Sequence, residues 1–167
     1  MKDIFVYDHF LDWESFNKIN VTINSGYFPW YFSCVTENNK KDEFQFSHLF
    51  YQTGGVNSDF CDMLNPLIKK LNATAIARIK ANLLLQTKNI KIFDYHTDFD
   101  WNHKWWTAIY YVNTNDGKTI FKNSREILSR ENRVVIFDGR YEHTGTTCTD
   151  EKNRLVINLN YYNKDIK

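Results

Sequence analysis

The sequence lacks the features that mark several common protein classes. Its 167 residues include only 2 prolines and 6 glycines, and they contain no internal repeat, linker or low-complexity segment. The 3 cysteines, Cys34, Cys61 and Cys148, are odd in number and show no Cys-x-x-Cys spacing. This pattern favours reduced thiols in a cytoplasmic protein over a disulfide framework or a cysteine-rich metal site.

Charge of one sign and long apolar runs are also missing. The formal net charge is +1, from 21 basic and 20 acidic residues, so we expect no general affinity for nucleic acid. The N-terminus has no apolar core of a signal peptide, and no apolar run approaches the length of a membrane span. We therefore expect neither a nucleic-acid nor a membrane partner. We also expect the protein to be a monomer.

Aromatic residues and alternating apolar residues are abundant instead. Aromatic side chains make up 17% of the chain, which suits a β-rich core. The length fits a single domain, residues 1–167, with a sizeable core. Apolar spacing predicts a first helix from Asp12 to about Gly26 and a second helix around Phe60 to Leu71 that restarts near Pro66. Strands are expected at residues 4–10, 27–35, 44–52, 74–87, 106–113, 134–137 and 154–161.

Two early helices followed by many strands predict a mainly β fold with flanking helices. The arrangement fits a double-stranded β-helix, also called a jelly roll or cupin-like fold, with its helices on one face. The turn signal Asn115-Asp116-Gly117 predicts a hairpin over residues 106–122.

His96-Thr97-Asp98 is the first candidate for a chemical site. In an extended segment residues i and i+2 project to the same face, so an imidazole and a carboxylate would converge. One further histidine would complete the facial triad that binds non-haem Fe(II). The triplet is a weak signal by itself, because a histidine two residues from an aspartate also arises by chance.

Two downstream features strengthen the triplet. The apolar run 134–137 continues into a turn that ends on His143, and a polar loop, Thr144 to Asn153, follows. The next strand places Arg154, Val156 and Asn158 on one face. An arginine among apolar neighbours needs an anionic partner.

Together these motifs resemble those of the 2-oxoglutarate- and Fe(II)-dependent oxygenases, in the branch similar to prolyl 4-hydroxylases. The resemblance covers roughly residues 75 to 162 and implies that His96, Asp98 and His143 are the catalytic metal ligands. It also implies that Arg154 binds the distal carboxylate of 2-oxoglutarate. The expected cofactors are Fe(II), the cosubstrate 2-oxoglutarate and O₂, with ascorbate as reductant. The residues that carry the resemblance are His96-Thr97-Asp98, residues 106–113, Phe137-Asp138-Gly139, His143 and Arg154.

Further cosubstrate contacts follow from the same resemblance. Tyr111 would add a hydroxyl to the carboxylate at Arg154, and Tyr110 would take that role if the strand slipped by one residue. Asn82 and Asn158 are weaker candidates for the same pocket. Val156 departs from the small hydroxyl residue that the family often has at this position.

The reaction implied is hydroxylation of an unactivated C–H bond, with release of succinate and CO₂. Trp101, Trp106 and Tyr141 could wall a groove for an extended peptide, with proline as the first candidate, or several of them could be core residues. A free amino acid or another small molecule is an alternative substrate. A non-redox β-barrel module that binds Zn²⁺ is an alternative class, but it would have no use for Arg154.

Overall fold

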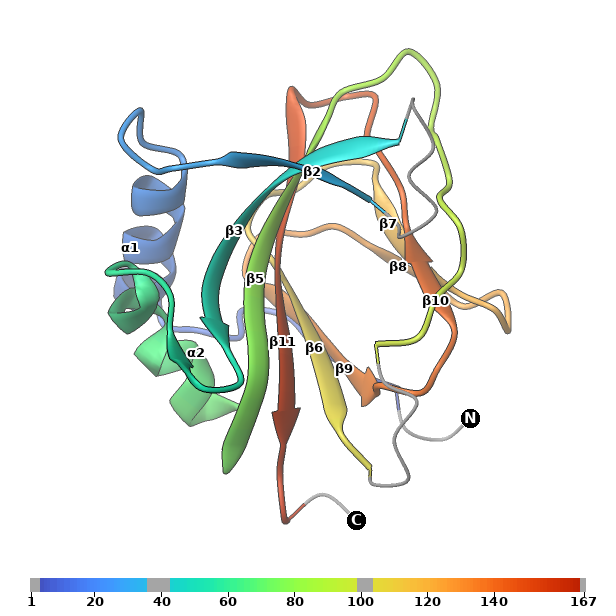
Figure 1. The fold of residues 1–167 in the computed structure, drawn as a ribbon. Helices are drawn as coiled ribbons and strands as arrows, with labels where there is room; N and C mark the ends of the chain where they lie inside the picture. Colours follow the sequence, from blue (N-terminus) through green and yellow to red (C-terminus); the bar gives the residue numbers. More distant parts are fainter. Residues whose placement is uncertain (1–3, 36–42, 99–103, 166–167) are drawn as a thin grey trace.

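The computed structural model describes residues 4–35, 43–98 and 104–165. Within these ranges the chain forms two antiparallel sheets, with helices on the outer face of the larger one (Figure 1). This confirms the predicted mainly β jelly roll with helices on one face. The larger sheet runs in the order β1 (Ile4–Tyr7), β9 (Arg133–Asp138), β6 (Trp106–Tyr111), β11 (Asn153–Tyr162), β5 (Ala75–Leu85), β3 (Phe44–Gln52) and β2 (Tyr31–Cys34), with β4 (Gly55–Val56) paired to β3. The smaller sheet runs in the order β10 (His143–Gly145), β7 (Lys118–Phe121) and β8 (Glu126–Leu128).

The helices form where capping and apolar spacing predict them. In α1 (Trp13–Ile23) the N-cap Asp12 accepts a hydrogen bond from the backbone N–H of Ser15 at 2.9 Å, as N-cap carboxylates do. The second helical region is a 3₁₀ turn, η1 (Cys61–Leu64), followed by α2 (Asn65–Lys70). The helix restarts next to Pro66, as predicted. Proline is tolerated in the first turn of a helix because the N–H that it lacks would have no hydrogen-bond partner there.

Alternation along the central strands separates the core from the site. Ile157 and Leu159 of β11 join Ile79 and Ala81 of β5 in the apolar cluster beneath the helices, which we call the helix-side cluster. The intervening residues face the smaller sheet, as period-two geometry requires. A second cluster, the inter-sheet cluster, lies on that face and consists of Ile4, Ile109, Tyr111, Phe121, Ile127, Val135, Phe137 and Val156.

The predicted hairpin over residues 106–122 is wrong. Strand β6 lies between β9 and β11 in the larger sheet, whereas β7 lies between β10 and β8 in the smaller sheet. Both edges of β6 are already occupied, so the chain crosses to the other sheet. The turn signal forms this corner, where the N–H of Gly117 donates to Asn115 Oδ1 at 3.0 Å, a side-chain turn typical of asparagine.

Asn132 ties the N-terminal segment to the larger sheet. Its amide nitrogen donates to the carbonyl of Leu11 at 2.9 Å, and its amide oxygen accepts from the N–H of Leu11 at 2.8 Å and from the hydroxyl of Tyr110 at 2.9 Å. The residue is buried and has a φ of 56°, a left-handed conformation that asparagine tolerates better than most residues.

We predict that Asn132→Ala lowers the free energy of unfolding by about 2–4 kcal/mol, because it removes these buried hydrogen bonds and adds backbone strain. Urea denaturation monitored by circular dichroism measures the change. Asn132→Gly keeps the left-handed backbone accessible and isolates the hydrogen-bond loss, while the exposed Asn89→Ala serves as control. An alanine variant as stable as the wild type would contradict the assignment.

Candidate metal centre and its cavity

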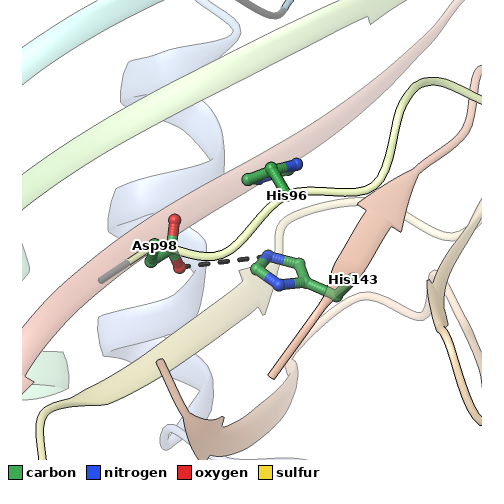
Figure 2. Close-up of side chains that lie close together, drawn as sticks. All are labelled: His96, Asp98 and His143. Carbon is green, nitrogen blue, oxygen red and sulfur yellow. Dashed lines mark ion pairs between the residues drawn. The ribbon is translucent and has the colours of Figure 1, made fainter. Parts of the chain in front are cut away.

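His96, Asp98 and His143 converge on one point (Figure 2). Their candidate ligand atoms all lie within 4.8 Å of one another. His96 and His143 exchange two backbone hydrogen bonds, each 3.0 Å long, and the N–H of Asp98 donates to the carbonyl of Gly139 at 3.0 Å. Backbone hydrogen bonds therefore fix the segment from His96 to Asp98 against β10 and against the turn that precedes β10.

His143 is held in one tautomer and one orientation. Its Nδ1 lies 2.9 Å from the carbonyl oxygen of Tyr141. A carbonyl oxygen can only accept a hydrogen bond, so Nδ1 carries the hydrogen and donates it. The lone pair is then on Nε2, which lies 3.9 Å from Asp98 Oδ2. The ring packs edge-on against Phe137, with centroids 4.7 Å apart. A backbone acceptor behind a histidine is the usual way to orient a metal-binding imidazole.

Asp98 is held from the opposite side by three strands. Thr107 of β6 donates its hydroxyl to Asp98 Oδ2 at 2.6 Å, and Thr107 Oγ1 accepts from Asn160 Nδ2 of β11 at 3.1 Å. Arg78 of β5 reaches Asp98 Oδ1 at 3.5 Å and donates through Nε to Asn160 Oδ1 at 3.1 Å. The carboxylate thus has a fixed position before any metal binds.

The protonation states suit metal binding. Burial alone would raise the pKa of Asp98, but His143, the hydroxyl of Thr107, His96 and Arg78 together lower it below its ordinary value. Burial lowers the pKa of His143, and His96 lowers it further, against the opposing effect of Asp98. An ionised carboxylate and a neutral imidazole are the forms that bind divalent metals, and two imidazoles with one carboxylate are typical of non-haem Fe(II) sites.

The triad opens into a cavity of about 700 Å³ that Arg154 also lines. Arg154 is only 3% exposed. Its Nε donates to Ser129 Oγ at 2.9 Å, and its Nη2 donates to Thr119 Oγ1 at 3.2 Å. Among the described residues no carboxylate lies within ion-pair distance of Arg154. Burial lowers the pKa of Arg154, but a guanidinium remains protonated in proteins. In the described part of the chain Arg154 is therefore a buried cation without a carboxylate counter-charge.

Gly117 and Gly145 leave the space that the Arg154 side chain occupies. A Cβ on Gly117 would lie 2.6 Å from Arg154 Cδ, closer than two such atoms can approach. A Cβ on Gly145 would lie 3.4 Å from Arg154 Nη1. The corner at Gly117 therefore packs directly on the arginine side chain.

The other predicted cosubstrate residues separate by strand face. Tyr111 lies on the Arg154 side, with its ring centroid 5.6 Å from the guanidinium carbon and its hydroxyl donating to Thr119 at 2.8 Å. Tyr110 faces the helix-side cluster and donates to Asn132. Asn82 and Asn158 both line the cavity. Of the two tyrosines, the structure therefore brings Tyr111 to the arginine.

Of the predicted substrate residues, only Trp106 and Tyr141 are described, and neither lines the cavity. Trp101 lies outside the described residues. Trp106 is 1% exposed and belongs to the helix-side cluster, so the expectation that it walls the cavity is corrected, because β6 turns its indole to the other face. Tyr141 packs against the inter-sheet cluster and contributes its carbonyl oxygen to His143.

Sequence reasoning missed the hydroxyl groups that hold the charged side chains. Thr107 supports Asp98, and Thr119 and Ser129 support Arg154. Thr107 has a sequence signal, because it shares strand parity with Tyr111. Thr119 and Ser129 have none, because they come from the corner and smaller sheet that were assigned incorrectly. Strand β10 was expected to be loop beyond His143.

Comparisons with known proteins agree with this geometry at the level of the fold. No protein-family model matches the sequence, and no curated protein matches it. Among solved structures, a 2-oxoglutarate-Fe(II) oxygenase family protein from Burkholderia pseudomallei is similar with a TM-score of 0.71 at 11% identity, over 96% of this chain and 86% of that one. A prolyl hydroxylase from Trichoplax adhaerens, in complex with a peptide fragment of hypoxia inducible factor, is similar with a TM-score of 0.69 at 13% identity, over 98% and 85% of the two chains.

A third similar structure is SnoN, an α-ketoglutarate-dependent non-haem epimerase from nogalamycin biosynthesis, with a TM-score of 0.70 at 10% identity over 97% of this chain and 78% of that one. The chain therefore has the fold of 2-oxoglutarate- and Fe(II)-dependent oxygenases, prolyl hydroxylases among them. In the part of the chain that the structure describes, no helix is long and apolar enough to cross a membrane.

We predict that Thr107→Val weakens Fe(II) binding about 10- to 100-fold, because it leaves Asp98 without its hydroxyl donor while preserving side-chain shape. Anaerobic calorimetry with Fe(II) measures the affinity. Thr53→Val, which removes a hydroxyl bonded to the carbonyl of Ala77 outside the cavity, is the matched control. Equal Fe(II) affinity in the Thr107 variant and the wild type would show that the hydroxyl does not support the metal ligand.

Proposed function

We propose that the protein is a 2-oxoglutarate- and Fe(II)-dependent dioxygenase that hydroxylates an unactivated C–H bond and releases succinate and CO₂. The observation that carries this proposal is the pairing of two features in one cavity. The His96–Asp98–His143 triad offers a metal one face of ligands, and Arg154 offers a buried cation with no acidic partner among the described residues. A structural metal site has no need of that cation, whereas a dicarboxylate cosubstrate does.

The triad would hold Fe(II) through an imidazole nitrogen of His96, Nε2 of His143 and a carboxylate oxygen of Asp98. The hydrogen bond from Thr107 and the carbonyl of Tyr141 fix two of these ligands before the metal arrives. The chemistry that these residues would gain from bound Fe(II) is activation of O₂, for which oxidative decarboxylation of 2-oxoglutarate would supply the electrons. Asp98 fills the ligand position that must be vacant for a halide, which favours hydroxylation.

Arg154 would bind the distal carboxylate of 2-oxoglutarate. Its planar fork can donate two parallel hydrogen bonds to a carboxylate, which lysine cannot do. Ser129 and Thr119 each accept one guanidinium hydrogen bond and so hold the group in place. Tyr111 positions Thr119 through its hydroxyl.

For the substrate we favour a peptidyl residue, with proline as the first candidate. The similarity to a prolyl hydroxylase in complex with a peptide supports this choice. A small-molecule substrate is the alternative, supported by the similarity to an epimerase of nogalamycin biosynthesis. Screening peptides and small molecules by mass spectrometry for one added oxygen atom distinguishes the two.

The primary test is succinate formation from 2-oxoglutarate with Fe(II), O₂ and ascorbate as reductant. We expect wild-type protein to form succinate and Asp98→Ala to form none, because the variant loses the anionic metal ligand. The exposed Asp59→Ala controls for loss of an aspartate elsewhere. Absence of both succinate and 2-oxoglutarate binding in the wild type would favour a non-redox metal-binding module.

We predict that Arg154→Met raises the KM for 2-oxoglutarate about 10- to 100-fold with a smaller change in kcat, because a charge-assisted pair is lost in binding. Steady-state succinate formation measures both constants. Arg154→Lys should restore only part of the affinity, since the forked geometry is lost. The exposed Arg130→Met is the control, and an unchanged KM in Arg154→Met would remove this arginine from the site.

A further inference from the structure

Lys80 is a second cation in the cavity that the proposed function does not use. It lies on β5, on the strand face that also carries Arg78 and Asn82, and all three residues line the cavity with the triad. In the antiparallel register Lys80 is directly opposite Asn158 of β11. Asn82 is therefore the next residue on the same face of β5, and Asn158 is the neighbour of Lys80 on the adjacent strand.

None of these three side chains has a partner in the described part of the chain. No ion pair or hydrogen bond joins the Lys80 ammonium to residues 4–35, 43–98 or 104–165. Asn82 Oδ1 and Asn158 Oδ1 are buried without a hydrogen-bond partner. Unpaired polar groups are costly in a protein interior. The two unpaired amide oxygens are acceptors, so a carboxylate would pair with these side chains through Nδ2, with each amide turned to present its nitrogen.

The two other cations that line the cavity, Arg78 and Arg154, already have roles, whereas the charge of Lys80 has none so far. Arg78 contacts Asp98 and Asn160, and Arg154 is held by hydroxyl groups at a separate position. Arg154 is opposite Leu84 in the register, four residues along β5 from Lys80, or about 13 Å of strand. Burial lowers the pKa of Lys80, and Arg78 lowers it further, with Asp98 as the opposing influence. An anionic ligand group at Lys80 would stabilise its charged form.

We propose that Lys80, together with Asn82 and Asn158, forms a second carboxylate subsite in this cavity, separate from Arg154. The ammonium supplies the charge, and each amide can turn its nitrogen toward the ligand as a donor. The carboxylate belongs either to the metal-side end of the 2-oxo acid or to the substrate that is hydroxylated. In the second case the substrate class is an acid, such as a free amino acid or an acidic peptide. This inference rests on the proposed function for the identity of the oxo acid.

Binding of two oxo acids tests the first source. Anaerobic calorimetry on Fe(II)-loaded protein compares 2-oxoglutarate with 2-oxovalerate, which lacks the distal carboxylate. If Lys80 binds the metal-side carboxylate, Lys80→Met weakens both ligands by the same factor, about 10-fold or more. Arg154→Met weakens only 2-oxoglutarate. Lys80→Arg should recover much of the affinity, and the exposed Lys88→Met should match the wild type.

Binding of a small carboxylate tests the second source. With Fe(II) and 2-oxoglutarate at saturation and O₂ excluded, acetate and succinate are titrated as probes. If Lys80 binds a substrate carboxylate, the wild type and Lys88→Met bind a probe, Lys80→Met binds it about 10-fold more weakly or not at all, and the affinities for both oxo acids are unchanged. Thermal unfolding of Lys80→Met confirms that the variant is folded.

The inference is overturned if Lys80→Met changes neither the oxo-acid affinities nor the binding of either probe. In that outcome Fe(II)-dependent binding of 2-oxoglutarate to the wild type would leave the proposed function intact. Conversely, a wild type that binds no oxo acid would refute the proposed function. Lys80-dependent binding of acetate or succinate would still be measurable, so the two failures are distinguishable.

Discussion

The pair of backbone hydrogen bonds between His96 and His143 is the constraint on which the site depends. These residues are 47 positions apart in the sequence, and the described residues 86–98 around His96 form no regular strand. The bridge brings both imidazoles to one place, and the hydrogen bond from Asp98 to Gly139 adds the carboxylate. Because backbone hydrogen bonds make these connections, the three candidate metal ligands are brought together without a metal ion.

The larger sheet determines where the charged side chains lie around this backbone bridge. Its inner face carries cations and amides among apolar side chains, and its outer face is an ordinary apolar core beneath the helices. Burying Arg154 without a carboxylate costs free energy, so its retention is understandable if binding of an anion offsets that cost. Gly117 allows this burial, since the crossover between sheets packs against the arginine.

Local patterns in the sequence predicted which side chains form the candidate metal centre, and tertiary contacts decided the rest. Strand parity placed Arg154, Val156 and Asn158 on one face, and the structure places all three at the cavity. The Asn115-Asp116-Gly117 turn was read as a hairpin because turn residues report the bend but not which sheet the next strand joins. Trp106 was misplaced, since an aromatic residue near a metal ligand gives no indication of its own strand face. Thr119 and Ser129 were missed because they depend on that same crossover.

The strict alternation along β5 and β11 also bears on how such a site changes. Lys80, Asn82 and Asn158 border the cavity, while the residues between them belong to the helix-side cluster. Substitutions at the cavity positions alter which ligand is accepted and leave the supporting packing in place. Recognition and stability are thereby encoded at interleaved positions of the same two strands, so a change of ligand does not require a change in the packing of the helices.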